Sequence, residues 1–339
     1  MQAQIISHQT PAVRRTMLGT VLPLSTPYLV QVFPVYACNF KCNYCVLSVP
    51  KSERGYISDL KTLDFTLYKK CIDDLQQFPQ KLRMLRFAGT GEPLLHEQLP
   101  EMIAYAVEAN ISESIDIVTN GALLLPELAN QLVEGGVSRI RVSIQGVNPE
   151  QYRQTTQVYG DYQKIVENVA YLYSIKGNVE VYVKIIDSAL DSEQDKQAFY
   201  SQFGDIADFV SVEHLLPATP LIDYDKVRGK ALMDKTQNGM AVASTDICPQ
   251  PFYMLQINPD GVVVPCCGME SPLKIDQLAN VSLLDIWHNK ALNLFRQQML
   301  TGRRSNNRVC AQCNQFRFAM FPEDVLDAYA SDLLSAYAD

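Results

Sequence analysis

The 339-residue sequence lacks a long apolar run. A membrane-spanning helix needs roughly 18 or more consecutive apolar residues, and no uninterrupted segment reaches that length. The nearest candidate is the uncharged stretch 16–40, which three prolines interrupt. It follows Arg14 and Arg15 as in a twin-arginine export signal, but cleavage after Ala37 would remove a segment that we expect to be a strand. We therefore expect a cytoplasmic protein that is not bound to a membrane.

The sequence also has no excess of basic over acidic residues. The chain carries 29 Lys and Arg residues against 37 Asp and Glu residues, which gives a net charge of −8 and an isoelectric point near 5.1. This balance argues against non-specific binding to nucleic acid. A small or neutral substrate fits better. The length suffices for one large α/β domain, alone or with an appendage.

The cysteines do not form the even, dispersed set of a disulfide framework. There are nine, and they gather in two groups that each contain a C-x2-C spacing. This pattern favours metal ligation in a reducing compartment, which also indicates the cytoplasm. Cys71 lies between the groups, on the apolar face of a predicted helix, and is expected in the core.

Strand-like and helix-like segments alternate along the first part of the chain. Apolar residues at i, i+3, i+4 and i+7 mark helix faces at 68–75 and 99–106. Pro126 and Gly135 bound a third predicted helix, and Gly177 closes a fourth. The six predicted strands are 28–36, 82–89, 114–121, 139–146, 179–186 and 208–216. This alternation predicts an α/β fold whose parallel sheet is open or curled into part of a barrel, with catalytic groups at the C-terminal ends of the strands.

A second, smaller unit follows a stretch without clear periodicity. Residues 254–267 predict a β-hairpin with its turn at Asp260-Gly261, and residues 283–300 predict one amphipathic helix. The tail 322–338 predicts a helix that packs on the domain or on a partner. The chain then divides into an N-terminal extension 1–27, a barrel domain 28–217, a linker 218–247, a small α+β domain 248–318 and a C-terminal helix 319–339.

Cys38, Cys42 and Cys45 stand directly after the first predicted strand, with no fourth cysteine or histidine nearby. Thiolates are the usual ligands of iron-sulfur clusters, and three of them on a four-iron cluster leave one iron open to an external ligand. Zinc is the competing interpretation, but a structural zinc site takes four ligands. The spacing therefore favours a cluster at the C-terminal mouth of the sheet.

The motif C-x3-C-x2-C, with Tyr44 before its last cysteine, resembles the signature of the radical S-adenosylmethionine superfamily. The segment AGTGEP resembles the family's Gly-Gly-Glu motif, which holds the methionyl amine, although Thr90 stands at the first glycine. Gln145 stands where the family often has Asp. The resemblance implies a partial (β/α)6 TIM-like barrel. It also implies cofactor-binding roles for Tyr44, Gly91, Glu92, Thr119, Asn120, Ser143 and Gln145. For the polar residues among them, capping of a strand end is the alternative.

In that family a reduced 4Fe-4S cluster splits S-adenosylmethionine into methionine and a 5′-deoxyadenosyl radical, which removes a hydrogen atom from an unactivated C–H bond. The resemblance thus implies such a cluster, with S-adenosylmethionine on its open iron. The cofactor supplies the difficult chemistry, while the protein orients one C–H group and excludes water and oxygen.

The second group of cysteines resembles the SPASM/twitch domains that follow the barrel in many radical enzymes. The full SPASM pattern has more cysteines, so the resemblance implies the shorter twitch version with one auxiliary 4Fe-4S cluster. Its expected ligands are Cys248, Cys266, Cys310 and Cys313. Full thiolate ligation suits electron transfer, and zinc is again the competing metal. Cys267 is then a packing residue, the ligand in place of Cys266, or a hydrogen-atom donor.

Three further polar residues lie near the predicted mouth. Lys184 is a charge inside an otherwise apolar strand, which indicates a role in binding cofactor or a substrate carboxylate, or else a salt bridge inside the barrel. Glu213 and His214 follow the sixth strand and could reach substrate, although adjacent strand residues face opposite sides. The basic segment 302–308 is expected to be an exposed loop; its functional interpretation is docking of an acidic electron donor such as flavodoxin or ferredoxin.

The compact cysteine pattern looks most like that of enzymes that dehydrogenate an alcohol carbon of an aminocyclitol and pass one electron to the auxiliary cluster. We therefore expect oxidation of a sugar or aminocyclitol. Redox-neutral epimerisation of a sugar or peptide, which needs a hydrogen donor such as a thiol, is an alternative. Peptide modification is another, although such relatives often carry a leader-binding domain and only 27 residues precede the first strand here. A zinc-stapled binding module is the non-enzymatic alternative.

Overall fold

The computed structural model describes residues 2–6, 15–54, 61–228, 235–268 and 270–338. Its framework is a ten-stranded sheet with the order β1-β7-β6-β5-β4-β3-β2-β8-β9-β10. Neighbouring strands are parallel from β1 to β8 in this order, and the pairs β8-β9 and β9-β10 are antiparallel. The strands are β1 Gln4–Ile5, β2 Leu29–Val32, β3 Met84–Phe87, β4 Ile115–Thr119, β5 Arg139–Ile144, β6 Glu180–Ile186, β7 Phe209–Glu213, β8 Met254–Ile257, β9 Val262–Val264 and β10 Asp276–Gln277.

The six predicted strands are β2 to β7, which confirms the predicted parallel α/β sheet. The predicted hairpin is β8 and β9, and Gly261 in its turn has a φ of +77°, which favours glycine. Strands β1 and β10 were not predicted, because two residues are too few to show a period. Since β8 pairs with β2, the hairpin continues the barrel sheet.

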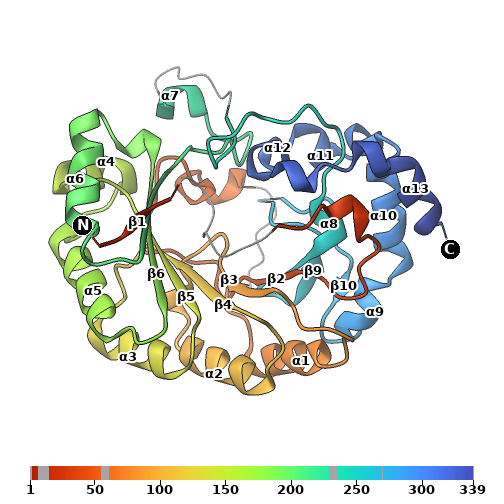
Figure 1. The fold of residues 1–339 in the computed structure, drawn as a ribbon, viewed down its shortest axis with the longest axis horizontal. Coiled ribbons are helices and arrows are strands. Elements are labelled where there is room, and N and C mark those ends of the chain that lie inside the picture. The colour runs from red at the N-terminus through yellow and green to blue at the C-terminus, as the bar shows by residue number, and fades with distance from the viewer. Residues whose placement is uncertain (1, 7–14, 55–60, 229–234, 269, 339) are drawn as a thin grey trace.

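Helices cover one face of the curved sheet, with α1, α2, α3 and α5 side by side along its outer side (Figure 1). The predicted third helix begins at Pro126 and ends before Gly135, and Gly177 follows the end of α5 with a φ of +54°. The helices are α1 Phe65–Leu75, α2 Leu99–Ala109, α3 Pro126–Glu134, α4 Pro149–Thr156, α5 Tyr162–Ile175, α6 Glu193–Phe203, α7 Tyr224–Arg228, α8 Gln250–Tyr253, α9 Leu283–Trp287, α10 Lys290–Leu300, α11 Arg308–Gln312, α12 Gln315–Ala319 and α13 Ala330–Ala336.

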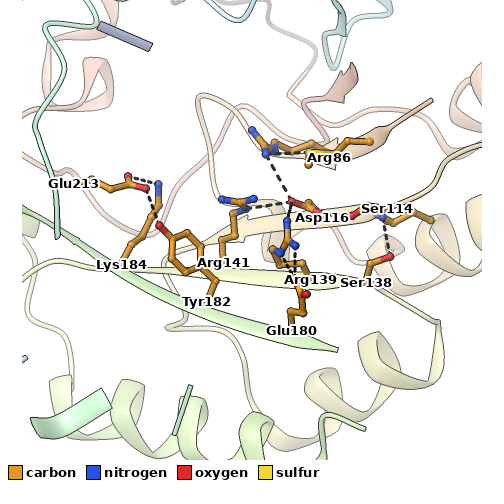
Figure 2. Close-up of polar contacts among 12 residues, drawn as sticks. Arg86, Ser114, Asp116, Ser138, Arg139, Arg141, Glu180, Tyr182, Lys184 and Glu213 are labelled. Carbon is orange, nitrogen blue, oxygen red and sulfur yellow. Dashed lines mark hydrogen bonds and ion pairs between the residues drawn. The ribbon is translucent and has the colours of Figure 1, made fainter. Parts of the chain in front are cut away.

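Alternation along the strands gives the sheet one apolar face and one polar face. Val30, Leu85, Ile117 and Ile140 are fully buried, as are the predicted helix faces of α1 and α2, which include Cys71. Because side chains alternate along a strand, the residues between these positions point to the concave face. Figure 2 shows the charged side chains of β3 to β7 on the face of the sheet opposite the helices.

The prediction of one helix over 283–300 is wrong. Helix α9 ends at Trp287 and α10 starts at Lys290. Asn289 between them caps α10, since its Oδ1 accepts a hydrogen bond from the backbone N–H of Ala291 at 2.6 Å. An asparagine favours a cap over a helix interior because its side chain competes for backbone donors. The break lets Arg296 donate to the carbonyl oxygen of Trp287 at 3.0 Å.

The C-terminal helix is shorter than predicted. Helix α13 covers Ala330–Ala336, and two short 3-10 turns at 322–324 and 327–329 precede it. Leu333 and Tyr337 are buried in one cluster with Phe295 and Met299 of α10. The tail therefore packs on the rest of the chain. The proposed domain boundaries stay a prediction.

None of the helices in the described ranges is long and apolar enough to cross a membrane. Of the arginine pair that resembles an export signal, Arg14 lies outside the described residues. Arg15 binds Asp324 at 2.7 Å. The predicted linker contains α7, and residues 229–234 of that linker lie outside the described residues.

Candidate metal centres and active site

The loop after β2 carries Cys38, Cys42 and Cys45 and is anchored on α4. Backbone N–H groups at positions 41 and 43 donate to carbonyl oxygens in the last turn of α4, at 2.9 and 2.8 Å. The ring of Phe40 is buried edge-on against Tyr152, with 5.9 Å between the ring centroids. The three cysteines are therefore held by a packed loop at the C-terminal end of the sheet.

Burial makes the three thiols weak acids. It raises the pKa of Cys38 to about 11, although the backbone N–H of Phe40 donates to this sulfur. It also raises the pKa of Cys42 and of Cys45. Thiolates at these positions need a bound cation to offset the cost of burying their charge. The irons of a cluster supply that positive charge, so the donor set fits such a group.

Within the ranges that the structure describes, no three His, Cys, Asp or Glu side chains form a group that could hold one metal ion. A structural zinc ion requires ligands that converge on one point. In an iron-sulfur cluster each thiolate binds its own iron.

The loop after β3 passes directly against the start of the cysteine loop. A Cβ at Gly91 would lie 2.0 Å from the carbonyl oxygen of Val35 and 3.0 Å from that of Ala37. The backbone N–H of Glu92 donates to the Ala37 carbonyl oxygen at 2.7 Å. Only glycine permits this approach, which sets the backbone at Gly91 beside the first cysteine.

Glu92 is a buried carboxylate that joins the ends of β3 and β4. Its Oε1 accepts from the Thr119 hydroxyl at 2.6 Å and from the Leu94 backbone N–H at 3.1 Å, and its Oε2 accepts from the Asn120 backbone N–H at 2.8 Å. Burial raises the pKa of Glu92 to about 6, and these hydrogen bonds act in the opposite direction. A carboxylate has about four lone-pair sites, so a further donor such as an ammonium group can still bind.

The predicted residues Thr119 and Asn120 thus contact Glu92. Asn120 also donates from its side chain to Asn39 at 2.7 Å, and its Nδ2 lies 3.8 Å from the Cys38 sulfur. These contacts connect the carboxylate to the loop of the first cysteine set. Gly91, Glu92, Thr119 and Asn120 do not line the cavity described next.

A cavity of about 230 Å³ opens at the C-terminal ends of β5, β6 and β7. It brings together residues that the sequence analysis singled out separately: Tyr44, Cys45, Ser143, Gln145, Lys184, Glu213 and His214. The Tyr44 hydroxyl donates to Gln145 Oε1 at 2.6 Å, and Gln145 Nε2 donates to the Ser143 carbonyl oxygen at 3.0 Å. The first cysteine set therefore shares one cavity with candidate cofactor and substrate residues.

Lys184 forms an ion pair in this cavity. Its Nζ lies 2.7 Å from Glu213 Oε2, which also accepts from Gln237 at 2.7 Å. Burial alone would raise the pKa of Glu213, but Lys184 and Gln237 outweigh it, so the pKa is lowered. Of the two predicted possibilities for Lys184, the structure shows the salt bridge.

His214 lies beside Glu213 in the cavity wall, although residues next to each other on a strand face opposite sides. Strand β7 ends at Glu213, so the alternation of side chains along the strand does not fix the direction of the His214 side chain. Its Nδ1 lies 2.8 Å from Asp187 Oδ2, and Asp187 Oδ1 accepts from the Leu215 backbone N–H at 3.0 Å. In a neutral imidazole held this way Nδ1 carries the hydrogen that is donated to Asp187, and Nε2 is then an acceptor.

Sequence reasoning missed Asp187 and Gln237. Asp187 directly follows β6, so its place at a strand end was a usable signal. Gln237 comes from the irregular segment between β7 and α8, where no period relates it to the barrel. Its contact with Glu213 exists only in the folded chain.

Four cysteines of the second group line a smaller cavity of about 40 Å³: Cys248, Cys266, Cys310 and Cys313. Cys267 does not line it. Instead its backbone N–H and its sulfur lie 3.2 and 3.5 Å from Gln250 Oε1, and Gln315 Nε2 lies 3.7 Å from the sulfur. Burial raises the pKa of Cys310 to about 11 and also raises the pKa of Cys248 and Cys266.

The basic segment 302–308 is not simply an exposed loop. Arg304 is buried and donates from Nη1 to the carbonyl oxygen of Cys310 and, at 3.1 Å, to that of Cys313. Its guanidinium therefore holds the C-x2-C segment in place. Arg308 is exposed, as predicted, and pairs with Glu270 at 2.6 Å.

Two sequence relatives match different shares of the chain. The chain is 24% identical over 310 residues to the tungsten-containing aldehyde ferredoxin oxidoreductase cofactor-modifying protein of Pyrococcus furiosus, and the match covers 76% of this chain and 80% of the relative. It is 32% identical over 154 residues to a probable GTP 3′,8-cyclase of Methanococcus maripaludis, which covers 45% of this chain and 42% of that protein.

Two solved structures share the fold. BtrN, in complex with AdoMet and 2-DOIA, superposes with a TM-score of 0.54 at 19% identity, covering 86% of this chain and 95% of BtrN. SuiB of Streptococcus suis, bound to S-adenosylmethionine, has a TM-score of 0.63 at 15% identity, covering 89% of this chain and 74% of SuiB. At these identities the likeness concerns the fold.

Two family models account for the two cysteine groups. The radical SAM superfamily model matches residues 32–187, which include the first group and the loop of Gly91 and Glu92. The SPASM model, an iron-sulfur cluster-binding domain, matches residues 248–314, which include the second group. The expected partial barrel with a C-terminal iron-sulfur region is confirmed. The chain is a radical SAM enzyme with a SPASM domain.

Proposed function

We propose that this enzyme oxidises a hydroxyl-bearing carbon of a sugar or cyclitol. The observation that carries the proposal is the shared cavity: Tyr44 and Cys45 of the first cysteine loop line the same space as His214, whose Nδ1 is held by Asp187. Removal of hydrogen from an alcohol carbon must be accompanied by loss of the hydroxyl proton. In this proposal His214 would be the proton acceptor beside the residues of the radical centre.

The residues fit two clusters. Cys38, Cys42 and Cys45 would hold a 4Fe-4S cluster with one open iron, and Glu92 would accept from the amine of S-adenosylmethionine. One auxiliary 4Fe-4S cluster would be held by Cys248, Cys266, Cys310 and Cys313. When bound, these groups supply the radical that removes a hydrogen atom and an acceptor for the remaining electron.

His214 takes the proton in this proposal. Its neutral Nε2 accepts the hydroxyl proton while Asp187 stabilises the imidazolium that results. Lys184 and Glu213 form a closed ion pair and orient the substrate without exchanging a proton. Tyr44, Ser143 and Gln145 would bind the polar part of S-adenosylmethionine.

Redox-neutral epimerisation is the second candidate, and the position of Cys267 favours it. This thiol lies outside the cavity lined by the other four cysteines of its group, so it is not needed as a ligand beside them. A free thiol can return a hydrogen atom to a substrate radical. Peptide modification stays a third possibility, since SuiB has been solved with the precursor peptide SuiA. We also propose a cytoplasmic location and reduction by a flavodoxin or ferredoxin.

The first test is anaerobic reconstitution with iron and sulfide, followed by iron counting and chromatographic assay of 5′-deoxyadenosine after reduction with S-adenosylmethionine. We expect about eight irons per chain and 5′-deoxyadenosine from the wild type, but none from the Cys38→Ala/Cys42→Ala/Cys45→Ala variant. Colourless protein that binds zinc and forms no 5′-deoxyadenosine would support a binding module instead.

The reaction type is tested with a panel of sugars and cyclitols in heavy water. Oxidation yields a product lighter by two hydrogen atoms, whereas epimerisation through an exchangeable thiol yields an isomer that carries deuterium. With an oxidised substrate in hand, His214→Gln should lower product formation by about 100-fold or more, the usual scale of a lost general base. Asp187→Asn should lower product formation by a similar factor.

A further inference from the structure

The concave face of the barrel carries a group of arginines around one carboxylate, which we call the arginine group: Arg86, Arg139 and Arg141 (Figure 2). Asp116 on β4 lies at its centre and is completely buried. Its Oδ2 lies 3.2 Å from Arg141 Nε, 3.6 Å from Arg139 Nη1 and 3.7 Å from Arg86 Nη2. The strand register explains the arrangement, because Arg86, Asp116 and Arg139 are aligned across β3, β4 and β5.

The arginine group has more positive charge than its acidic partners neutralise. Arg139 donates through Nε and Nη2 to Glu180, so this guanidinium is well occupied. Three guanidinium groups face two carboxylates, those of Asp116 and Glu180, which leaves one positive charge. The nearby Lys184–Glu213 pair is balanced and does not change this count.

The surplus donors belong to Arg86 and Arg141. Arg86 Nε is buried and has no acceptor among the described residues, and Nη2 donates to the thioether sulfur of Met84, a weak acceptor. Burial lowers the pKa of Arg86, with the neighbouring Arg141 charge as the next cause. Arg141 donates to Asp116 through Nε alone, so its outer nitrogens stay available within the described part of the chain. A network that served stability alone would pair each buried donor.

The arginine group is connected to the cavity of the proposed active site. The Arg141 guanidinium lies 5.1 Å from the ring centroid of Tyr182, and the Tyr182 hydroxyl lies 3.4 Å from Glu213 Oε1 in the cavity wall. The side chains of Arg86 and Arg141 are about one quarter and one fifth exposed, at 25% and 18%. Arg86 and Arg141 do not line the cavity themselves, and the contacts of Tyr182 join Arg141 to its wall.

We infer that Arg86 and Arg141 bind an oxyanion group of the substrate, a carboxylate or a phosphate. This inference rests on the proposed function, since it names the chemical class of that substrate. The planar fork of arginine matches both oxyanions, and a bound anion would neutralise the surplus charge and use the free donors. An aminocyclitol would instead bring an ammonium group beside guanidinium groups. Among hydroxylated substrates, the arginine group thus selects phosphorylated or carboxylated ones.

The test titrates inorganic phosphate and, separately, acetate into the reconstituted full-length enzyme at low ionic strength, followed by calorimetry. We expect one saturable site. Arg86→Gln or Arg141→Gln should raise the dissociation constant for the anion by about 10-fold or more. The matched control is Arg153→Gln, since Arg153 is exposed on α4 and pairs with Glu150. Tighter binding of phosphate would point to a phosphorylated substrate, and tighter binding of acetate to a carboxylated one.

Equal binding by the wild type and the Arg86→Gln and Arg141→Gln variants, or no binding by the wild type, would overturn the inference. If Arg86→Gln fails to fold, Arg86→Lys keeps the charge but loses the fork, and it should still bind phosphate more weakly than Arg153→Gln does. Formation of 5′-deoxyadenosine by the wild type is measured in parallel. If it forms but neither anion binds, the inference alone fails; if none forms, the proposed function fails whatever the anions do.

Discussion

Lys184 Nζ lies 2.7 Å from Glu213 Oε2, and this pair links strands β6 and β7 inside the barrel. The Glu213 side chain is 8% exposed and that of Lys184 is 19% exposed, so water screens the pair little. The same carboxylate accepts from Gln237, which lies outside the barrel strands. The pair therefore ties the segment after β7 to the active-site cavity.

Lys184→Met should destabilise the protein by about 3 kcal/mol at pH 7, because it leaves a buried carboxylate without its cation. Urea unfolding measures the loss. The Glu213 pKa is lowered in the folded state, so the pair contributes stability above the unfolded pKa of this carboxyl and loses it as the pH falls through the folded pKa. The difference between wild type and variant should shrink in acid.

Two controls accompany that measurement. Lys196→Met removes an exposed pair with Glu193 on α6 and should cost less than about 1 kcal/mol. The double variant Lys184→Met/Glu213→Gln should be more stable than Lys184→Met alone, because no uncompensated charge is left. Equal losses for Lys184→Met and Lys196→Met would show that the buried pair is not stabilising.

Gly91→Ala should abolish formation of 5′-deoxyadenosine. The added Cβ would lie 2.0 Å from the Val35 carbonyl oxygen, so the loop carrying Glu92 must move away from the cysteine loop. Gly160→Ala is the matched control, since the nearest atom to its Cβ would be Phe40 Cε1 at 4.0 Å. The assay compares 5′-deoxyadenosine per reconstituted cluster. Full activity in Gly91→Ala would contradict the close approach of the two loops.

Binding of S-adenosylmethionine should weaken below about pH 6. Burial raises the Glu92 pKa to about 6, so the carboxylate is protonated below that pH and attracts an ammonium group less. The affinity should fall by up to about 10-fold per pH unit there, as for one titrating group. Equilibrium dialysis of the reconstituted protein from pH 5 to 8 measures this, and the Glu92→Gln profile should be flat and weak.

The same raised pKa affects stability with the opposite sign. The folded state holds the Glu92 proton more tightly than the unfolded state. The Glu92 contribution to stability is therefore largest below the ordinary glutamate pKa of 4.5 and declines as the pH rises to about 6. Glu92→Gln should remove this decline from a pH series of unfolding measurements. A wild-type series that matches the variant would place the Glu92 pKa near its ordinary value.

Cys266→Ala and Cys267→Ala should differ in iron content. Cys266 lines the small cavity with the other three cysteines and Cys267 does not, so Cys266→Ala should lose about four irons and Cys267→Ala none. Iron and sulfide counts of the reconstituted variants decide between them. The reverse result would make Cys267 the ligand and remove it as a hydrogen-atom donor.

The sequence alone determined the strands and helices of the parallel sheet, and the family resemblance added that the sheet curls into a partial barrel. Alternating strands and amphipathic helices carry their periods locally, so β2 to β7 and the faces of α1 and α2 were predictable. Short strands and helix breaks were not: β1 and β10 have two residues each, and Asn289 ends a helical period that otherwise continues to 300. At a helix cap a side chain replaces a backbone carbonyl as the hydrogen-bond acceptor, and the spacing of apolar residues does not reveal where this happens.

The candidate site was predictable in its parts but not in its assembly. The spacing of Cys38, Cys42 and Cys45 and the motif at Gly91-Glu92 were visible in the chain. Tertiary structure decided which parts of the chain meet. Asp187 contacts His214 from the segment after β6, and the hairpin of β8 and β9 joins the barrel sheet through the pairing of β8 with β2. The arginine group also arises from tertiary structure, because the register of β3, β4 and β5 brings residues far apart in sequence onto one face.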